Sequence, residues 1–167
     1  MVAEIDLVTD GKFRVKDSEQ TTFVDLDSMV KGEGILASSV NGVIERVIVL
    51  KVIADDTALT TGDGKMHFTI PAELNGMNLV SVGAHVYTVS SSGLPTIQIH
   101  NLTDTVDMLS TRITIDANEK DSKDATTAAV IDTTHDDVAT GDEIRIDVDV
   151  AGTGTKGLEI RMGFRKP

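Results

Sequence analysis

The residue types that carry out most enzymatic chemistry are unevenly represented in this sequence. The chain of 167 residues holds 27 Asp and Glu and four His, but no Cys. A thiol nucleophile and a Cys-ligated zinc site are therefore excluded. The serine and metal motifs Gly-x-Ser-x-Gly and His-Glu-x-x-His are missing, as is the P-loop, so neither an activated nucleophile nor an open metal position has a signature. We expect a protein that is not an enzyme and has no cofactor.

One acidic stretch begins like a calcium-binding loop. Residues 147–152 match the opening Asp-x-Asp-x-x-Gly, but position twelve of such a loop falls on Leu158, where an EF-hand places a bidentate Glu. The interpretation we favour is a strand with Asp147 and Asp149 toward solvent. Its core-facing residues are then Ile146, Val148 and Val150.

The histidines offer a second possible metal site. His67, His85 and His100 each fall on the polar side of an alternating run, and none has a second histidine two or four residues away. A site built from all three is conceivable, but we expect surface or interface residues. His135 next to Asp136 and Asp137 predicts an acidic loop that could hold a cation. We expect no metal.

The composition favours β-structure. Val, Ile and Thr together make 53 of 167 residues, and these β-branched side chains suit a pleated sheet better than a helix. With no Trp, one Tyr and four Phe, the core must be aliphatic. The formal net charge of −12 argues against binding to nucleic acid or to an anionic membrane. No apolar run approaches the ~18–20 residues of a membrane-spanning helix, and the start does not resemble a signal peptide.

Alternating apolar and polar residues dominate the chain from residue 66 onward. Such period-two runs, separated by turns rich in Gly and Asp, are typical of antiparallel strands with one buried face. The sequence predicts an all-β fold, an antiparallel sandwich or barrel without intervening helices. The predicted core comprises Met66, Phe68, Ile70, Val80, Val82, Val86, Ile97, Ile99, Ile113, Ile115, Ile144, Ile146, Val148, Ile160, Met162 and Phe164.

The first part of the chain has a different pattern. Residues 43–53 are the most apolar stretch, which indicates a strand buried on both faces or covered by a partner. Before it, the apolar residues follow no period. We predict an extended N-terminal arm at 1–45, which attaches to another subunit or particle, and a β-sandwich domain at 46–167. The predicted attachment residues are Phe13, Phe23, Leu26, Met29, Ile35 and Leu36.

Charge is also distributed unevenly. Residues 116–149 hold eleven acidic residues against three basic ones, whereas 156–167 hold four basic residues and one acidic residue. One interpretation is that the acidic loops only keep the protein soluble. The alternative is that acidic and basic segments meet across a subunit contact.

Four stretches resemble small β-sandwich virion proteins of tailed bacteriophages. They are residues 62–80, 106–116, 129–149 and 156–165, which occur in family-like order over roughly 60–166. The resemblance implies a jelly-roll-like sandwich that serves as a head decoration or cement subunit, a head fibre or a tail-fibre piece, and it implies a homotrimer. It carries over no catalytic residues, and it does not extend to the arm.

We therefore expect a non-enzymatic structural protein of the virion, assembled in the host cytoplasm. The favoured function is capsid decoration, with the major capsid protein or another virion protein as partner. The alternative is a tail-fibre or receptor-binding module that recognises a host surface. A free carbohydrate-binding module is a weaker third possibility because no secretion signal is evident and aromatic residues are scarce.

Overall fold

The structure, a computed structural model, describes residues 4–7, 13–16, 24–25 and 45–167. The chain divides into two compact units, residues 1–44 and residues 45–167, and the second unit is called the body below. In the described residues every strand pairing is antiparallel and no α-helix is present. The predicted all-β antiparallel class is therefore confirmed.

The first unit contains a small sheet of three short strands. These are β1 (Glu4–Leu7), β2 (Phe13–Lys16) and β3 (Val24–Asp25), in the order β1-β2-β3. Val15 lies opposite both Ile5 and Val24. Part of the segment predicted as an extended arm is thus paired as a sheet, because alternation at Ile5-Asp6-Leu7 and Phe13-Arg14-Val15 suits a pleated ribbon.

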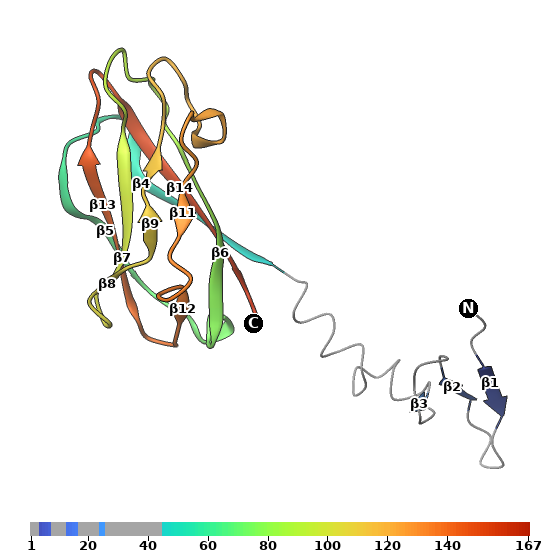
Figure 1. The fold of residues 1–167 in the computed structure, drawn as a ribbon. Coiled ribbons are helices and arrows are strands. Elements are labelled where there is room, and N and C mark those ends of the chain that lie inside the picture. The colour runs from blue at the N-terminus through green and yellow to red at the C-terminus, as the bar shows by residue number, and fades with distance from the viewer. Residues whose placement is uncertain (1–3, 8–12, 17–23, 26–44) are drawn as a thin grey trace. The chain divides into compact units, whose positions relative to one another are not determined.

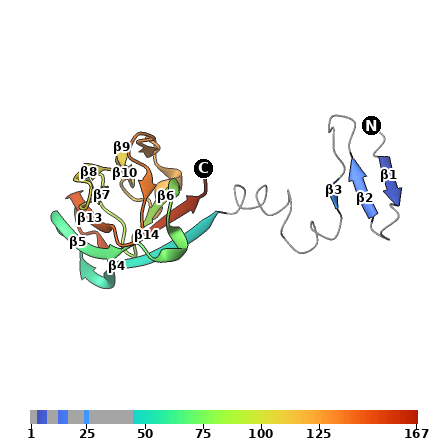
Figure 2. The same cartoon turned by 90° about the horizontal axis from the view of Figure 1, so that it is seen from below.

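A four-stranded sheet and a five-stranded sheet build most of the body (Figures 1 and 2). The β14 sheet has the order β12 (Asp137–Val138), β6 (Met77–His85), β14 (Lys156–Arg165) and β4 (Arg46–Ala58). The β13 sheet has the order β10 (Ile113–Thr114), β7 (Thr96–Asn101), β13 (Glu143–Val150) and β5 (Gly62–Thr69), with β8 (Val106–Asp107) also paired to β7.

Shorter elements connect these sheets. The strands β9 (Leu109–Thr111) and β11 (Val130–Ile131) pair with each other. Two single turns of 3-10 helix, η1 (Ala72–Leu74) and η2 (Ser122–Asp124), lie in the connections that follow β5 and β10. In η2 the side chain of Asp121 accepts a hydrogen bond from the Lys123 amide, which satisfies one free donor at the start of the turn.

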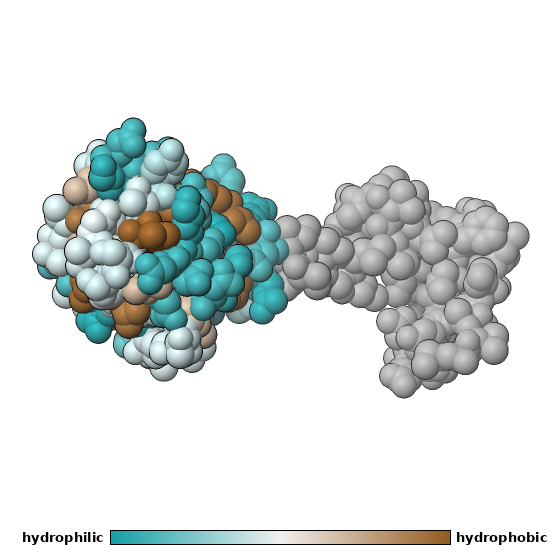
Figure 3. Space-filling model, turned by 90° about the horizontal axis from the view of Figure 1, so that it is seen from above, coloured by the Kyte–Doolittle hydropathy of each residue, from teal (hydrophilic) through white to brown (hydrophobic). Residues whose placement is uncertain are grey.

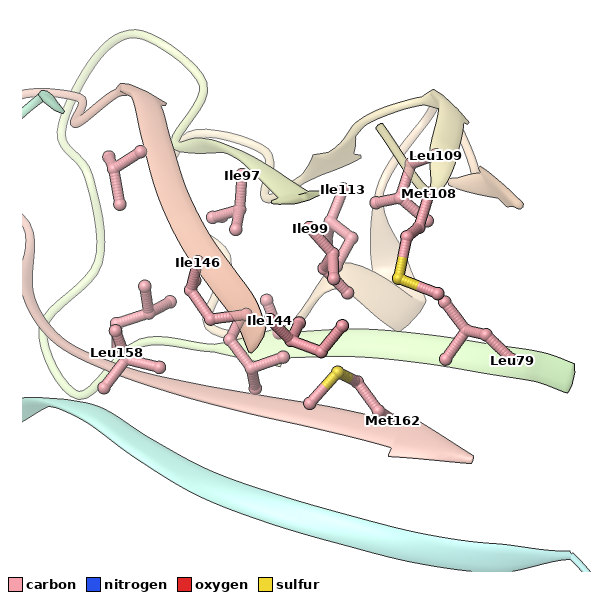
Figure 4. Close-up of a cluster of buried hydrophobic side chains, with 14 of the residues drawn as sticks. Leu79, Ile97, Ile99, Met108, Leu109, Ile113, Ile144, Ile146, Leu158 and Met162 are labelled. Carbon is pink, nitrogen blue, oxygen red and sulfur yellow. The ribbon is translucent and has the colours of Figure 1, made fainter. Parts of the chain in front are cut away.

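Aliphatic side chains from both sheets fill the space between them (Figure 4). Ile144 and Ile146 of β13 and Ile97 and Ile99 of β7 lie on one side of this space, and Leu158 and Met162 of β14 lie on the other. Twelve of the sixteen predicted core residues are buried. They are Ile70, Val86, Ile97, Ile99, Ile113, Ile115, Ile144, Ile146, Val148, Ile160, Met162 and Phe164. The alternating pattern therefore predicted most of the core correctly, since nine of these side chains lie on the inward side of a strand. The other three, Ile70, Val86 and Ile115, directly follow a strand.

The exceptions have local causes. Val80 is only partly buried, whereas its neighbour Leu79 is 1% exposed. The pairing of β6 with β14 shifts at this point, from Gly163 opposite Ser81 to Phe164 opposite Leu79, so that Val80 is an extra residue. Such a β-bulge inverts the inward and outward positions beyond it. The prediction for Val80 is wrong for this reason. Met66, Phe68 and Val82 are partly buried and pack against the core.

The described part of the apolar run, residues 45–53, is not buried on both of its faces. Within β4 the side chains of Ile48 and Leu50 pack against the core, but Val47 and Val49 on the other face are 60% and 55% exposed. β4 is the last strand of the β14 sheet, and in the described residues only β14 pairs with it. Of the two predicted alternatives, burial on both faces is wrong for this chain, and coverage by a partner stays a prediction.

Candidate functional site

The outer face of the β14 sheet contains a shallow groove. Its floor has little side-chain bulk, because Gly163 of β14 lies between Ser81 of β6 and Val47 of β4, and Gly83 lies opposite Arg161. Glycine in a strand often marks a place where another chain or ligand approaches the backbone closely. The groove has a volume of about 510 Å³.

One wall of this groove comes from the segment that follows η2. Ala125, Ala128 and Ala129 line it, and Val47 lines the opposite side. The segment is held to the sheet by a hydrogen bond of 2.9 Å from the Ala84 amide to the Ser122 hydroxyl. The groove therefore has small apolar walls, which can take an apolar side chain or a stretch of extended backbone from another molecule.

A salt bridge fixes the end of the groove. Arg161 Nη2 lies 2.7 Å from Oδ1 and 2.9 Å from Oδ2 of Asp121. Burial acts to raise the pKa of Asp121, but hydrogen bonds from the Lys123 amide and from Arg161, with the positive charge of Arg161, lower it below its ordinary value. This pair joins the acidic segment 116–149 to the basic segment 156–167 within one chain. The alternative in which acid and base meet across a subunit contact does not describe these two residues.

Nearer to β4, Ser81 donates a hydrogen bond to the carboxylate of Glu45, which lies over Gly163. Beyond the groove, the outer face of β4 presents Val47 and Val49 to solvent. In Figure 3 one face of the molecule shows hydrophobic patches separated by hydrophilic and neutral surface. The exposed large hydrophobic residues of the described part are Val47, Tyr87, Leu94, Val49, Val130 and Val150. Val47 and Val49 stand out because they are neighbours on one strand.

The three strand histidines do not come together in one site. His67 and His100 flank Arg145 on the outer face of the β13 sheet, whereas His85 belongs to the β14 sheet. Nδ1 of His67 lies 2.8 Å from Glu143 Oε1, and Nδ1 of His100 lies 2.7 Å from Asp107 Oδ1. Across the described ranges no group of three His, Cys, Asp or Glu side chains is placed to hold a metal ion.

The calcium-like stretch is a strand, but its exposure differs from the prediction. Asp147 is only 4% exposed, and Val150 is 43% exposed. Asp147 is stabilised by Arg145 Nε, 2.8 Å from its Oδ1, and by a hydrogen bond of 2.8 Å from the Gly64 amide. Because the pairing of β13 with β7 shifts between Val148 and Val150, Val150 leaves the inward position. The predictions for Asp147 and Val150 are therefore wrong.

The acidic loop at 135–137 is held by hydrogen bonds within the protein. Asp136 is 9% exposed, and its Oδ1 accepts a hydrogen bond of 2.9 Å from Asn78 Nδ2. His135 Nδ1 lies 2.8 Å from Asp132 Oδ2. Hydrogen bonds from Thr134 and then from His135 lower the pKa of Asp132 to about 2.

A glycine spacing typical of dinucleotide-binding loops occurs between β13 and β14. Gly152, Gly154 and Gly157 have the order Gly-x-Gly-x-x-Gly, which needs to follow a strand and open a helix in order to bind phosphate. Here the segment joins two strands, and all three glycines have positive φ. The spacing serves the turn between the sheets.

Of the predicted attachment residues only Phe13 is among the described residues. Phe13 begins β2, and Phe23, Leu26, Met29, Ile35 and Leu36 lie outside the described residues. The groove residues were not predicted from the sequence. The signal that could have indicated them is the presence of Gly83 and Gly163 inside two alternating strands.

Comparisons of the chain with protein-family models, with curated proteins and with solved structures gave no match. In the part of the chain that the structure describes, no helix is long and apolar enough to span a membrane.

Proposed function

We propose that this protein is a non-enzymatic structural component of a tailed-bacteriophage virion, a decoration or cement protein that binds the outer surface of the head and reinforces it. The observation that supports this most is the resemblance of four stretches in residues 62–165 to such virion proteins. All four stretches lie in the antiparallel body. The proposed partner is the major capsid protein or another virion protein, and the proposed location is the assembled particle.

We further propose that the body is a jelly-roll sandwich. A jelly roll has eight strands in two sheets and can be described as a long antiparallel ribbon rolled up, in which strand 1 pairs with 8, 2 with 7, 3 with 6 and 4 with 5. Strands one to eight can be assigned in chain order to β4, β5, β6, β7, β10, β12, β13 and β14. The four pairings of a jelly roll are then β4–β14, β5–β13, β6–β12 and β7–β10. Two further pairings, β6–β14 and β7–β13, join these pairs into the two sheets and support this topology.

The charge of the protein supports a position outside the head. A net charge of −12 disfavours binding to the packaged DNA, so an acidic protein suits a layer on the solvent side of the shell. The segment 1–45 is proposed as the attachment element. The resemblance adds a homotrimer, for which light scattering of the full chain should give three times the mass of 17.8 kDa or a multiple of that value.

Copy number per particle tests the proposed location. Quantitative mass spectrometry of purified virions should find this protein in numbers comparable with the major capsid protein, which is present in hundreds of copies. A handful of copies per particle would instead assign it to the tail, the alternative with a receptor-binding role. Absence from purified virions would overturn both assignments.

A further inference from the structure

In the described residues one edge of β4 is unpaired. The first half of this strand has a regular pairing with β14 and exposed apolar side chains. From Arg46 to Lys51 it pairs with β14 residue by residue, from Phe164 opposite Arg46 to Glu159 opposite Lys51. In the described residues no strand pairs on its other side. The N–H and C=O groups of alternate residues therefore point outward along a straight strand, which is the geometry that accepts an added strand.

The second half of β4 differs in this respect. Beyond Lys51 the register with β14 shifts twice, and Ala58 pairs with Lys156 while Ile53 pairs with Leu158. The residues between Ile53 and Ala58 include Asp55 and Asp56, both exposed. Bulges and charges are the means by which proteins prevent an edge strand from pairing. Because the register shifts are confined to the second half, and the charged residues of the first half lie only at its two ends, the first half is better suited to pairing.

The open half of β4 is complementary to itself in an antiparallel arrangement. Its outward side chains are Val47, Val49 and Lys51 in alternate positions, with Glu45 directly before the strand. Within the chain Glu45 accepts a hydrogen bond from Ser81, and Lys51 Nζ lies 2.6 Å from Asp55 Oδ1 at the exposed surface. When two copies pair antiparallel about Ile48, Glu45 of each lies opposite Lys51 of the other, and Val47 lies opposite Val49. Both opposite-charge and aliphatic cross-strand pairs stabilise antiparallel strands. In this register the residues on the other face of the strand also lie opposite one another, with Arg46 of one copy opposite Leu50 of the other.

We propose that residues 45–51 form a two-fold contact with the same residues of a second copy of this chain, which joins two β14 sheets into one continuous sheet. The contact would cover Val47 and Val49, which are 60% and 55% exposed in the single chain. A two-fold contact uses the same surface on both copies and cannot close a ring of three. It therefore gives a dimer, or a hexamer if the chain also forms the proposed trimer.

Replacement of the central apolar residue tests this contact. In the full chain, Val49→Lys should weaken association at least tenfold in analytical ultracentrifugation, because a charge replaces Val at both symmetric positions. The species should then fall to half its mass, from dimer to monomer or from hexamer to trimer. The matched control is Val130→Lys, since Val130 is 50% exposed on β11 and should leave the mass unchanged.

A charge exchange tests the register. Glu45→Lys alone and Lys51→Glu alone each place like charges opposite one another and should each weaken association about tenfold, whereas the double variant restores opposite charges and should recover most of the affinity. Thermal melts check that every variant is folded. A monomeric wild-type chain would overturn the proposal, as would a trimer or other assembly whose mass is insensitive to Val49→Lys. Failure of the double variant to recover would overturn the register centred on Ile48.

Discussion

The free energy of folding depends on some residues of the body much more than on others. Phe164 and Phe68 illustrate this, because both lie on inward positions of alternating strands but only Phe164 is buried on all sides, at 1% exposed. Phe68 belongs to β5, the last strand of the β13 sheet, and it packs against the core from the margin. The cost of truncating a side chain depends on how completely its surroundings enclose it.

Phe164→Ala should lower the free energy of unfolding by about 3–5 kcal/mol, since it leaves a cavity in an aliphatic core. Phe68→Ala should cost clearly less, because solvent can reach part of the space it vacates. Urea denaturation monitored by circular dichroism measures both. Equal losses for the two variants would contradict the burial difference.

The hydrogen-bonded carboxyl of Asp132 gives a second prediction at this scale. Its pKa is lowered to about 2, first by the Thr134 hydroxyl and then by His135. Folding favours the charged form of the Asp132 carboxyl. Its stabilising effect is therefore present above pH ~4, the pKa expected in the unfolded chain, and is lost as the pH falls through about 2. An NMR titration of the Asp132 carboxyl carbon should show this low value. Thr134→Val, which removes the hydroxyl, should raise the pKa toward 3.8, and no rise would mean that Thr134 is not its main cause.

At the scale of elements, irregularities in the strands determine which surfaces are available. The bulge at Val80 of β6 places Leu79 in the core. In β4 the register shift after Ile53 brings Asp55 close to Gly157 of β14. A Cβ atom on Gly157 would lie 2.9 Å from Tyr87 Cβ and 3.0 Å from Asp55 Cα. Glycine is needed there for space as well as for its φ of +67°.

Gly157→Ala should therefore destabilise the body by more than Gly154→Ala. Both glycines have positive φ, so each variant includes the ~1–2 kcal/mol cost of a left-handed backbone at a residue with a side chain. Only Gly157 adds a steric conflict, because no atom lies within 4 Å of a Cβ on Gly154. Thermal denaturation of the two variants measures the difference, and a Gly154→Ala loss as large as that of Gly157→Ala would argue against the close approach of β4.

At the scale of the whole molecule, the two units are expected to have separable roles. The body contains its own aliphatic core between two sheets, whereas the proposed attachment residues precede it. Ordering a segment costs ~1–2 kcal/mol per residue in conformational entropy, and contact with a partner can offset this cost. The attachment hypothesis therefore predicts that loss of the first unit affects binding to particles more than folding.

Deletion of residues 1–40 should leave a folded body that no longer binds phage heads. Circular dichroism and thermal melts test folding, and co-sedimentation with heads that lack the protein tests binding, with the full chain as control. Retention of full binding would mean that attachment runs through the body and would remove the basis for the hypothesis. Unfolding on deletion would mean that the first unit supplies part of the body.

The sequence by itself determined the β class of this protein and most of its core. Runs such as Thr96–His100 and Glu143–Val148 alternate strictly, and in a pleated strand alternate side chains must face opposite sides, so Ile97, Ile99, Ile144 and Ile146 could be assigned to the core without knowledge of the fold. The same reasoning failed at Val80 and Val150, where one residue too many on a strand inverts the alternation and no local pattern records it.

Only the tertiary structure decided which strands lie at the sheet edges and which residues meet on the outer faces. Whether the apolar run containing Val47 and Val49 is central or at an edge depends on pairing with β14, which is more than a hundred residues away in the chain. The groove over Gly83 and Gly163 and the pair of Asp121 with Arg161 likewise join distant segments. Local propensity carries no information on such long-range pairing, because the sheet order is set by the packing of the whole body.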